Sequence, residues 1–395
     1  MARDVLCLSH LRWDFVYQRP NHLMSRAARD RRVFFVEEPV SAGDDGPGLR
    51  TVVREGVTVV TPTIPDGLDE AATESALAAL VDGLTRGERI DRPVVWYYTP
   101  MALPWTRRIN AAGVVYDSMD YLAGFRGAPP RLLELEDALL GRADLVFTGG
   151  ASLHRRMSGR HPDVHCFPSS VDLAHFRRAR TAQPEPPDQL GIPRPRLGYA
   201  GVVDERVDLE LIDGVAAARP DVSIVLLGPI AKIAPEDIPD RPNIVRLGLK
   251  PYAQLPAYLA GWDAGWMPFA RNEATRYISP TKTPEYLAAG RPVISTSIHD
   301  VVEPYSRLGF VTIADGVDET LGALDRIATG VVPDQRAVDA FLATGSWDRT
   351  WAAMAELVDH LAAREPAGHG GAAHLRARPA AAPALAGSAA TATLE

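Results

Sequence analysis

Short runs of apolar, mostly β-branched residues alternate with longer amphipathic stretches along most of the chain. The runs have the length of buried strands, and the stretches between them have the residue spacing of helices that cover a core. This alternation predicts parallel sheets with helices on both faces, a doubly wound, Rossmann-like α/β architecture. The expected strands are residues 5–9, 33–37, 57–62, 94–98, 114–117, 145–148 and 165–167, then 197–200, 223–227, 244–247, 265–268, 293–296 and 311–313; expected helices include 21–28, 73–84 and 131–140.

The composition changes near the middle of the chain. A segment rich in Pro, Gln, Asp and Arg, without an apolar period, indicates a linker between two domains. A capped amphipathic helix follows the second domain, and the last residues are mostly Ala, Gly and Pro, a composition typical of disorder. The expected parts are a first Rossmann-like domain at 1–176, a linker at 177–195, a second Rossmann-like domain at 196–345, a helix at 346–364 with Ser346 as its N-cap, and a disordered tail at 365–395.

Composition and charge narrow the class of protein. With 395 residues, of which 46% are hydrophobic and 23% charged, the chain suits a soluble protein of two domains. A formal net charge of −8 argues against a nucleic-acid partner. Two cysteines, no leader-like start and no apolar run of membrane length lead us to expect a cytoplasmic protein. The basic stretches 26–32 and 154–161 leave peripheral membrane contact open.

The segment SPTKTPEYLAAGRPVIST, residues 279–296, predicts a short helix that leads into a buried strand. Ser279 or Thr281 can cap this helix, and Gly290 can end it. The chain has only three lysines, and one of them, Lys282, falls in the first turn, where the helix dipole disfavours a cation. A diphosphate bound at the start of the helix would explain a lysine there.

Glu285 follows about one turn after the cap, where its carboxylate could accept hydrogen bonds from both hydroxyls of a ribose. The plain alternative is an ordinary helix on which Lys282 and Glu285 are simply solvated. Ligands of doubly wound domains bind beyond the carboxyl ends of the strands. The cleft between the two expected domains is therefore the expected site.

Several segments, among them NEATRYISPTKTPEYLAAGRPVIST, FPSSVDLAHF, VVYDSMDYLAGF and LGYAGVVDERVDLELI, together resemble the family 4 glycosyltransferases of the two-domain GT-B fold. The resemblance covers almost the whole chain. It implies that Glu285 holds the ribose of a nucleotide-sugar donor. It also implies that Lys282 and Thr283 meet the diphosphate and that Arg206 lies near the family's phosphate-binding arginine. The terminal helix around Trp351 would cross back onto the first domain.

The chain departs from the family pattern at two places. A second Glu is usual eight positions before the ribose Glu, and Tyr277 stands there, which leaves the donor sugar unspecified. A Lys is usual shortly after the phosphate Arg and is missing; Lys232 could replace its charge, and a solvated surface lysine is the equal alternative. Further donor contacts are expected from Ser279, Asn272 and Thr275 and, for the base, from the loop near Gly248.

The first domain offers candidates on the acceptor side. The bulky loop SHLRWDFVYQRPNHLM follows the first strand, and we expect its His10, Trp13 and Arg19 at the cleft; a plain helix start is the alternative. Asp117 and Asp120 are three residues apart after a strand, as a base and its orienting partner would be. Helix capping is the alternative role for Asp120.

We therefore expect a glycosyltransferase that moves a sugar from a nucleoside-diphosphate sugar to a glycan, a lipid-linked or a small acceptor. The resemblance implies retention of the anomeric configuration. The histidines are scattered and no Asp-x-Asp occurs, so we expect no metal, and the expected catalytic groups are His10, Asp117, Arg206 and Lys282. Two alternatives stay open: a nucleotide-sugar epimerase, and a non-catalytic protein of a polysaccharide assembly complex.

Overall fold

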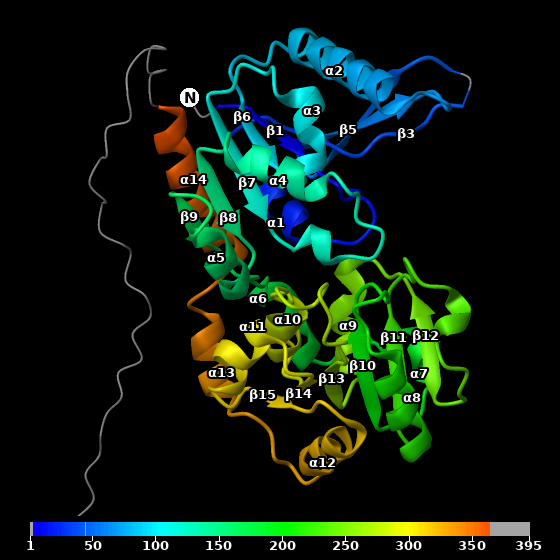
Figure 1. The fold of residues 1–395 in the computed structure, drawn as a ribbon. Helices are drawn as coiled ribbons and strands as arrows, with labels where there is room; N and C mark the ends of the chain where they lie inside the picture. The colour runs from blue at the N-terminus through cyan, green and yellow to red at the C-terminus, as the bar shows by residue number, and fades with distance from the viewer. Residues whose placement is uncertain (1–2, 44, 364–395) are drawn as a thin grey trace, which may run out of the picture. The chain divides into compact units, whose positions relative to one another are not determined.

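Two sheets built mainly of parallel strands organise the computed structural model, which describes residues 3–43 and 45–363 (Figure 1). The strands of the first are β1 (Val5–Leu8), β2 (Val33–Val36), β3 (Val40–Ser41), β4 (Gly48–Arg54), β5 (Val57–Ile64), β6 (Val94–Tyr97), β7 (Gly113–Ser118), β8 (Leu145–Thr148) and β9 (Val164–Cys166). Those of the second are β10 (Arg196–Ala200), β11 (Ser223–Leu227), β12 (Ile244–Gly248), β13 (Ala264–Met267), β14 (Val293–Ser295) and β15 (Val311–Ile313).

The strand orders are those of doubly wound sheets. The first sheet runs β3-β5-β2-β1-β6-β7-β8-β9, with β4 paired antiparallel to β5, and the second runs β12-β11-β10-β13-β14-β15. Both orders reverse direction beside the strand that begins the sheet, which is where ligands of such folds bind. The predicted α/β class is confirmed, and each expected strand is present within about two residues of its predicted bounds.

Helices connect the strands, and those expected at 21–28, 73–84 and 131–140 are present. They are α1 (Arg19–Ala27), α2 (Glu70–Gly87) and α4 (Leu132–Leu140). The others are α3 (Leu103–Thr106), α5 (Ala151–Ser158), α6 (Leu173–Arg177), α7 (Pro187–Leu190), α8 (Leu209–Ala218), α9 (Leu255–Ala260), α10 (Lys282–Ala288), α11 (His299–Val301), α12 (Val317–Ala328), α13 (Gln335–Leu342) and α14 (Trp347–Ala362). Short 3₁₀ turns include η1 (Pro100–Ala102), η2 (Leu122–Gly124), η3 (Arg178–Arg180) and η5 (Tyr252–Gln254).

Both faces of the first sheet are covered, because alternate residues of a strand point to opposite faces. On β1, Val5 and Cys7 pack with α1 and α14, whereas Leu6 and Leu8 pack on the other face, with α2 and α4 among their neighbours. Continuous apolar strands such as VLCL are the signature of burial on both sides, and this explains why the pattern alone located them.

The segment expected to be a linker, residues 177–195, is more ordered than its composition predicts. It contains η3 and α7, and Gln189 of α7 is fully buried. The Gln189 side chain accepts a hydrogen bond from Trp262 Nε1 (3.0 Å) and donates one to the carbonyl of Tyr258 (3.0 Å). This segment is therefore packed on the second sheet. Residues 1–364 form one compact unit, so the expected domain boundaries stay predictions, and the tail expected at 365–395 lies outside the described residues.

Helix α14 packs on the first sheet although it follows the second in the chain. Ser346 caps it as predicted, since its hydroxyl accepts a hydrogen bond from the Arg349 amide (3.2 Å). Its buried stripe includes Met354 and Leu361, which join the apolar cluster of β1 and β6. Gly113, the first residue of β7, lets the helix approach, because a Cβ at that position would overlap the Leu361 side chain.

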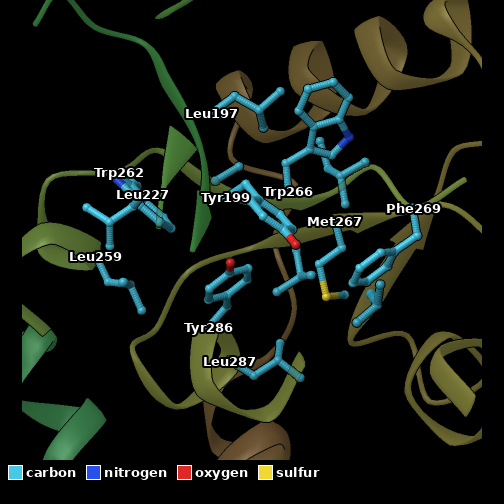
Figure 2. Packing of buried hydrophobic residues seen from close by; sticks show 14 of the residues in the cluster. Leu197, Tyr199, Leu227, Leu259, Trp262, Trp266, Met267, Phe269, Tyr286 and Leu287 are labelled. Carbon is cyan, nitrogen blue, oxygen red and sulfur yellow. The ribbon is translucent and has the colours of Figure 1, made fainter. Parts of the chain in front are cut away.

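The core of the second sheet holds large aromatic side chains, among them Tyr199, Trp262 and Tyr286 (Figure 2). Two glycines of the strands make room for these rings. A Cβ on Gly198 of β10 would overlap the Trp262 ring, and one on Gly265 of β13 would overlap the Tyr286 ring. Tyr286 belongs to α10 and is fully buried, and its hydroxyl accepts a hydrogen bond from the Ala200 amide at the end of β10 (2.7 Å). This contact ties α10 to the carboxyl end of the central strand.

We predict that Met354→Ala lowers the free energy of unfolding by about 2–5 kcal/mol, because it leaves a cavity between α14 and the first sheet. Glu356→Ala, on the exposed face of the same helix, should change it by less than about 0.5 kcal/mol. Urea unfolding followed by circular dichroism measures both, and equal stabilities of the two variants would contradict the packing of α14.

Candidate functional site

Two adjoining hollows lie between the carboxyl ends of the two sheets. The small cavity has a volume of about 80 Å³, and the large hollow has about 360 Å³. Gln18, Asp120 and Arg206 line both, so the two spaces form one cleft. The small cavity also contains Arg19 and Lys282, and the large hollow also contains His10. The cleft therefore lies where the sequence and the strand order predict that a ligand binds.

Lys282 reaches into the small cavity from the first turn of α10. Its side chain lies over Gly201, whose φ of +153° and missing Cβ provide the space, since a Cβ there would overlap Lys282 Cε. The ammonium lies 5.2 Å from the ring centroid of Tyr199 and 5.7 Å from that of Phe269. Burial and the nearby Arg206 lower the pKa of Lys282, although Glu285 acts in the opposite direction. No hydrogen bond or ion pair fixes its ammonium among the described residues.

Glu285 follows Lys282 by one turn and is partly buried. Burial raises the pKa of the Glu285 carboxyl, and the attraction of Lys282 opposes that rise. Tyr252 of η5 lies near: its buried hydroxyl has no hydrogen-bond partner among the described residues, and its pKa is raised by burial and then by the charge of Glu285. Two polar groups are therefore left without a protein partner on the expected ribose side of α10.

Arg206 follows β10 and is held by a carboxylate of its own. Its Nε and Nη2 donate to the two oxygens of Asp204 at 2.7–3.1 Å, and Asp204 is buried. Burial alone would lower the pKa of Arg206, but the hydrogen bonds to Asp204 raise it overall. The guanidinium also lies 5.3 Å from the ring centroid of Phe125, which comes from the first sheet's side of the cleft. Arg206 is therefore a fixed, fully charged group in the wall of the cleft.

Arg19 starts α1 and brings a third cation to the small cavity. Its Nε and Nη2 donate to Asp117 at 2.9–3.2 Å, and its Nη1 donates to the Phe167 carbonyl at 2.7 Å. Both members of this ion pair are buried, and Asp117 is completely inaccessible. Asp117 lines neither hollow, so the structure gives it the role of orienting Arg19 and not the catalytic role that we expected.

Asp120 is the acid that faces the cleft. It lines both hollows, and its carboxylate makes no hydrogen bond among the described residues. Burial raises its pKa, while Arg206 and Lys282 pull it down. Of Asp117, within β7, and Asp120, just after it, Asp120 is therefore the one that a substrate could reach. Its expected place on the acceptor side fits its position, and the capping alternative is not seen.

The aromatic loop after β1 is divided between the cleft and the core. His10 lines the large hollow with a buried Nδ1 that has no partner among the described residues, and burial lowers its pKa to about 4. Trp13, expected at the cleft, is 6% exposed and packs edge-on against Phe35, with ring centroids 5.1 Å apart. It lines neither hollow, because its apolar ring completes the core beneath α1.

The polar residues expected on the donor side mostly brace the loop before α10. Thr275 is buried and donates to the Ala270 carbonyl, and Asn272 donates to the Glu205 carbonyl at 2.9 Å. Thr283 is buried beneath the helix. None of these three lines either hollow. Asn272 and Thr275 form their hydrogen bonds within the fold, so these side chains need no ligand to complete them.

Three other expected donor residues have distinct positions. Ser279 lines the small cavity, and its carbonyl accepts a hydrogen bond from Ser169 of the first sheet's side. Lys232 lines the large hollow, with its ammonium 4.3 Å from the ring centroid of Phe125. Gly248 ends β12 with a φ of +70° and lines neither hollow. Phe125 was missed by sequence reasoning; its place in DYLAGF, directly after the acidic pair, was the available signal.

Comparison with known proteins supports the same architecture. No family model matches the chain. A protein of Bacillus subtilis named "Putative teichuronic acid biosynthesis glycosyltransferase TuaH" is 26% identical over 247 residues, which cover 56% of this chain and 60% of that protein. The match thus spans less than two thirds of the length of this relative.

Solved structures match over nearly the whole chain. Sucrose-phosphate synthase of Thermosynechococcus elongatus matches with a TM-score of 0.66 and 14% identity over 91% of this chain and 99% of its own. HepE of Anabaena, in complex with UDP and glucose, matches with a TM-score of 0.62 and 16% identity over 90% and 99% of the two chains. The chain has the GT-B fold. The narrower resemblance to family 4 stays a prediction.

The family 4 pattern has a second Glu at the position of Tyr277. In this chain the Tyr277 side chain packs against its neighbours instead. Tyr277 contacts Tyr121 edge-on, with ring centroids 5.3 Å apart, and Arg276 lies over the Tyr277 ring at 5.3 Å. Tyr121 in turn carries Arg156 on its face at 4.5 Å. An aromatic junction between the two sheets therefore stands at the position where the resemblance implied a Glu.

The basic stretches that left membrane contact open are largely neutralised within this GT-B chain. Arg26 and Arg29 pair with Asp348, Arg31 pairs with Asp30 and Asp359, and Arg32 pairs with Asp4. Within the described residues no helix is long and apolar enough to cross a membrane. The same residues contain no group of three or more His, Cys, Asp or Glu placed to bind a metal ion.

We predict that Asp117→Asn lowers the free energy of unfolding by about 3–5 kcal/mol, because it leaves Arg19 buried without its counter-charge. Asp221→Asn removes an exposed partner of Arg219 and should cost far less, because water screens an exposed ion pair. Chemical unfolding of both variants at pH 7 tests this, and a similar loss in each would show that the buried pair is not special.

We also predict an acid-sensitive contribution from His10. Its pKa in the folded protein, about 4, lies below the ordinary value of 6.5, so the unfolded chain binds a proton more readily. Stability from this residue is present above about pH 6.5 and is lost as the pH falls towards 4. Between pH 7 and pH 5, His10→Asn should lose less stability than the wild type. The control His360→Asn, at an exposed position of α14, should lose as much as the wild type. Equal losses in His10→Asn and the wild type would exclude a buried neutral imidazole.

Proposed function

We propose that this chain is a glycosyltransferase that takes a sugar from a nucleoside-diphosphate donor. The observation that carries the proposal is that, of three cations around the small cavity, two have a carboxylate partner and one has none. Arg206 has Asp204 and Arg19 has Asp117, but Lys282 has no ion pair among the described residues. A partly buried ammonium without a counter-charge is costly. An anionic ligand between the two sheets would remove that cost, and in a GT-B fold the corresponding ligand is a diphosphate.

The arrangement suits the departure of a nucleoside diphosphate. Charge develops on the phosphate oxygens as the bond to the sugar breaks, and fixed cations stabilise that charge without having to reorganise. Asp204 and Asp117 fix the two arginines, while Lys282 reaches the same cavity from α10. An anion bound there would raise the pKa of Lys282 back towards its ordinary range. These three cations would supply the positive charge that a metal ion supplies elsewhere, so we propose a metal-independent reaction.

The ribose would lie on the next turn of α10. Glu285 is a hydrogen-bond acceptor and the Tyr252 hydroxyl can both donate and accept, and neither has a partner among the described residues. Two vicinal hydroxyls would satisfy both groups. The similar structures named above include one solved with UDP and glucose, and UDP is the nucleotide that we propose to test first.

The acceptor would enter through the large hollow. Asp120 and His10 both line this space, and a hydroxyl placed between the two hollows would meet the free carboxylate of Asp120. We propose that Asp120 holds the acceptor hydroxyl and that the configuration of the donor is retained, with a donor phosphate oxygen taking the acceptor proton. His10, uncharged at neutral pH, can accept a hydrogen bond there without competing for the phosphate.

The test is a thermal-shift screen of UDP, GDP, ADP and TDP without added metal. We expect one nucleotide to raise the melting temperature of the wild type. That shift should be lost in Lys282→Met and Glu285→Ala, since affinity for a diphosphate depends on charge and for a ribose on the acceptor oxygen. Hydrolysis of the matching sugar nucleotide then reports on turnover.

Arg219→Met is the control. Arg219 precedes β11, so it lies at the amino ends of the strands, whereas the cleft lies at their carboxyl ends, and it pairs with Asp221 and Asp325. It should bind the nucleotide like the wild type. Absence of a shift with any nucleotide would overturn the proposal. Binding without turnover of any sugar nucleotide would reject catalysis and leave a nucleotide-binding protein.

A further inference from the structure

A third hollow, which we call the side hollow, adjoins the large hollow on the side of the first sheet. It has a volume of about 410 Å³ and lies over the carboxyl ends of β1, β2 and β6, beneath α2 and α3. Glu38, Thr99 and Met101 line both the side hollow and the large hollow. A molecule in the large hollow that extends past Met101 would therefore reach the side hollow.

The lining of the side hollow is largely apolar. Leu77, Met101 and Trp105 form much of its wall, and Leu68 stands at its rim with 41% of its surface exposed. In the large hollow, Phe15 is 40% exposed. Large apolar side chains left open to water beside a continuous groove are typical of a surface that a ligand covers.

The charges of the side hollow are all of one sign. Its charged lining residues are Glu37, Glu38, Glu70 and Glu74, and among the described residues no Lys or Arg lines it. Arg12 pairs with Glu37, and Arg131 pairs with Glu70 and Glu74. Glu38 has no ion pair among the described residues. The cations of the cleft, in contrast, line the small cavity and the large hollow, so an anion is favoured there and disfavoured in the side hollow.

We propose that the side hollow binds the apolar, uncharged tail of the acceptor, whose hydroxyl end lies at Asp120. This inference rests on the proposed function, since it names the class of acceptor for the same site. The acceptor is then an amphipathic molecule, a sugar or alcohol head with an aliphatic tail, and not a polyanionic glycan. Binding energy gained on the tail would hold the head against the donor.

The probes are methyl β-D-glucopyranoside, hexyl β-D-glucopyranoside and 5-carboxypentyl β-D-glucopyranoside, titrated calorimetrically below the micelle concentration with UDP present. We expect the hexyl glucoside to bind about tenfold or more tighter than the methyl glucoside, because the chain buries several methylenes. The 5-carboxypentyl glucoside should bind about threefold or more weaker than the hexyl glucoside, because the carboxylate at the end of its tail meets an acidic wall.

Leu68→Glu places a charge on the rim of the side hollow at an exposed position, so the fold should tolerate it. Its matched control is Leu308→Glu, also exposed (48%) and outside the hollows of the cleft. Leu68→Glu should abolish the advantage of the hexyl chain, and Leu308→Glu should keep it. Equal affinities for the hexyl and methyl glucosides in the wild type would overturn the inference. The same affinity of both variants for the hexyl glucoside would also overturn it, as would a preference for the 5-carboxypentyl glucoside.

The UDP shift measured on the same samples separates the two proposals. A normal UDP shift without any advantage of the hexyl chain rejects the side hollow and leaves the proposed function standing. Absence of a shift with UDP, GDP, ADP and TDP in the wild type rejects the proposed function, whatever the glucosides do.

Discussion

The cleft depends on how tightly α10 is held against the second sheet. Tyr286 packs where Gly265 has no side chain, and its hydroxyl accepts the amide hydrogen of Ala200 at the end of β10. The helix is only seven residues long and could not persist by itself. Its position is set by this aromatic anchor, and the anchor therefore sets where Lys282 and Glu285 point. A side chain at Gly265 would displace both groups without touching either of them.

The glycines at the strand ends extend the same constraint. A Cβ on Gly201 would overlap the Lys282 side chain, and a Cβ on Gly228 would overlap the Gly201 carbonyl. Both residues also have φ values near +150°, which other L-residues rarely adopt. The loops after β10 and β11 can thus approach each other and leave a channel for one long cationic side chain. Lys282 is confined by backbone rather than by a counter-ion, which is why its charge remains available to a ligand.

The sequence predicted what periodicity and local motifs encode. The buried strands are continuous apolar runs, and the pair of Lys282 and Glu285 on one helix could be read from their spacing. β4 was missed because GLRTVVR is exposed over most of its length and has no apolar run to mark it. Gln189 was missed because its burial depends on Trp262, more than seventy residues later.

The roles of Asp117 and Asp120 could not be divided from sequence. Asp117 is near the end of β7 and Asp120 comes just after it. What separates their roles is Arg19, which is about a hundred residues away in the chain and binds both oxygens of Asp117. A long-range ion pair leaves no local pattern. The structure shows that the more accessible of the two acids is the one three residues further on.

The position of Asp120 bears on the second Glu that the donor motif of this chain lacks. Tyr277 and Tyr121 fill the junction where that carboxylate was expected, and among the described residues Asp120 is the only acid that lines the small cavity. Asp120 belongs to the first sheet, whereas the cations Lys282 and Arg206 belong to the second. A sugar bound to those cations would find its carboxylate partner on the opposite side of the cleft. If the proposed function is correct, Asp120 would both contact the donor sugar and hold the acceptor hydroxyl. A productive site would then need groups from both sheets around the carboxylate of Asp120.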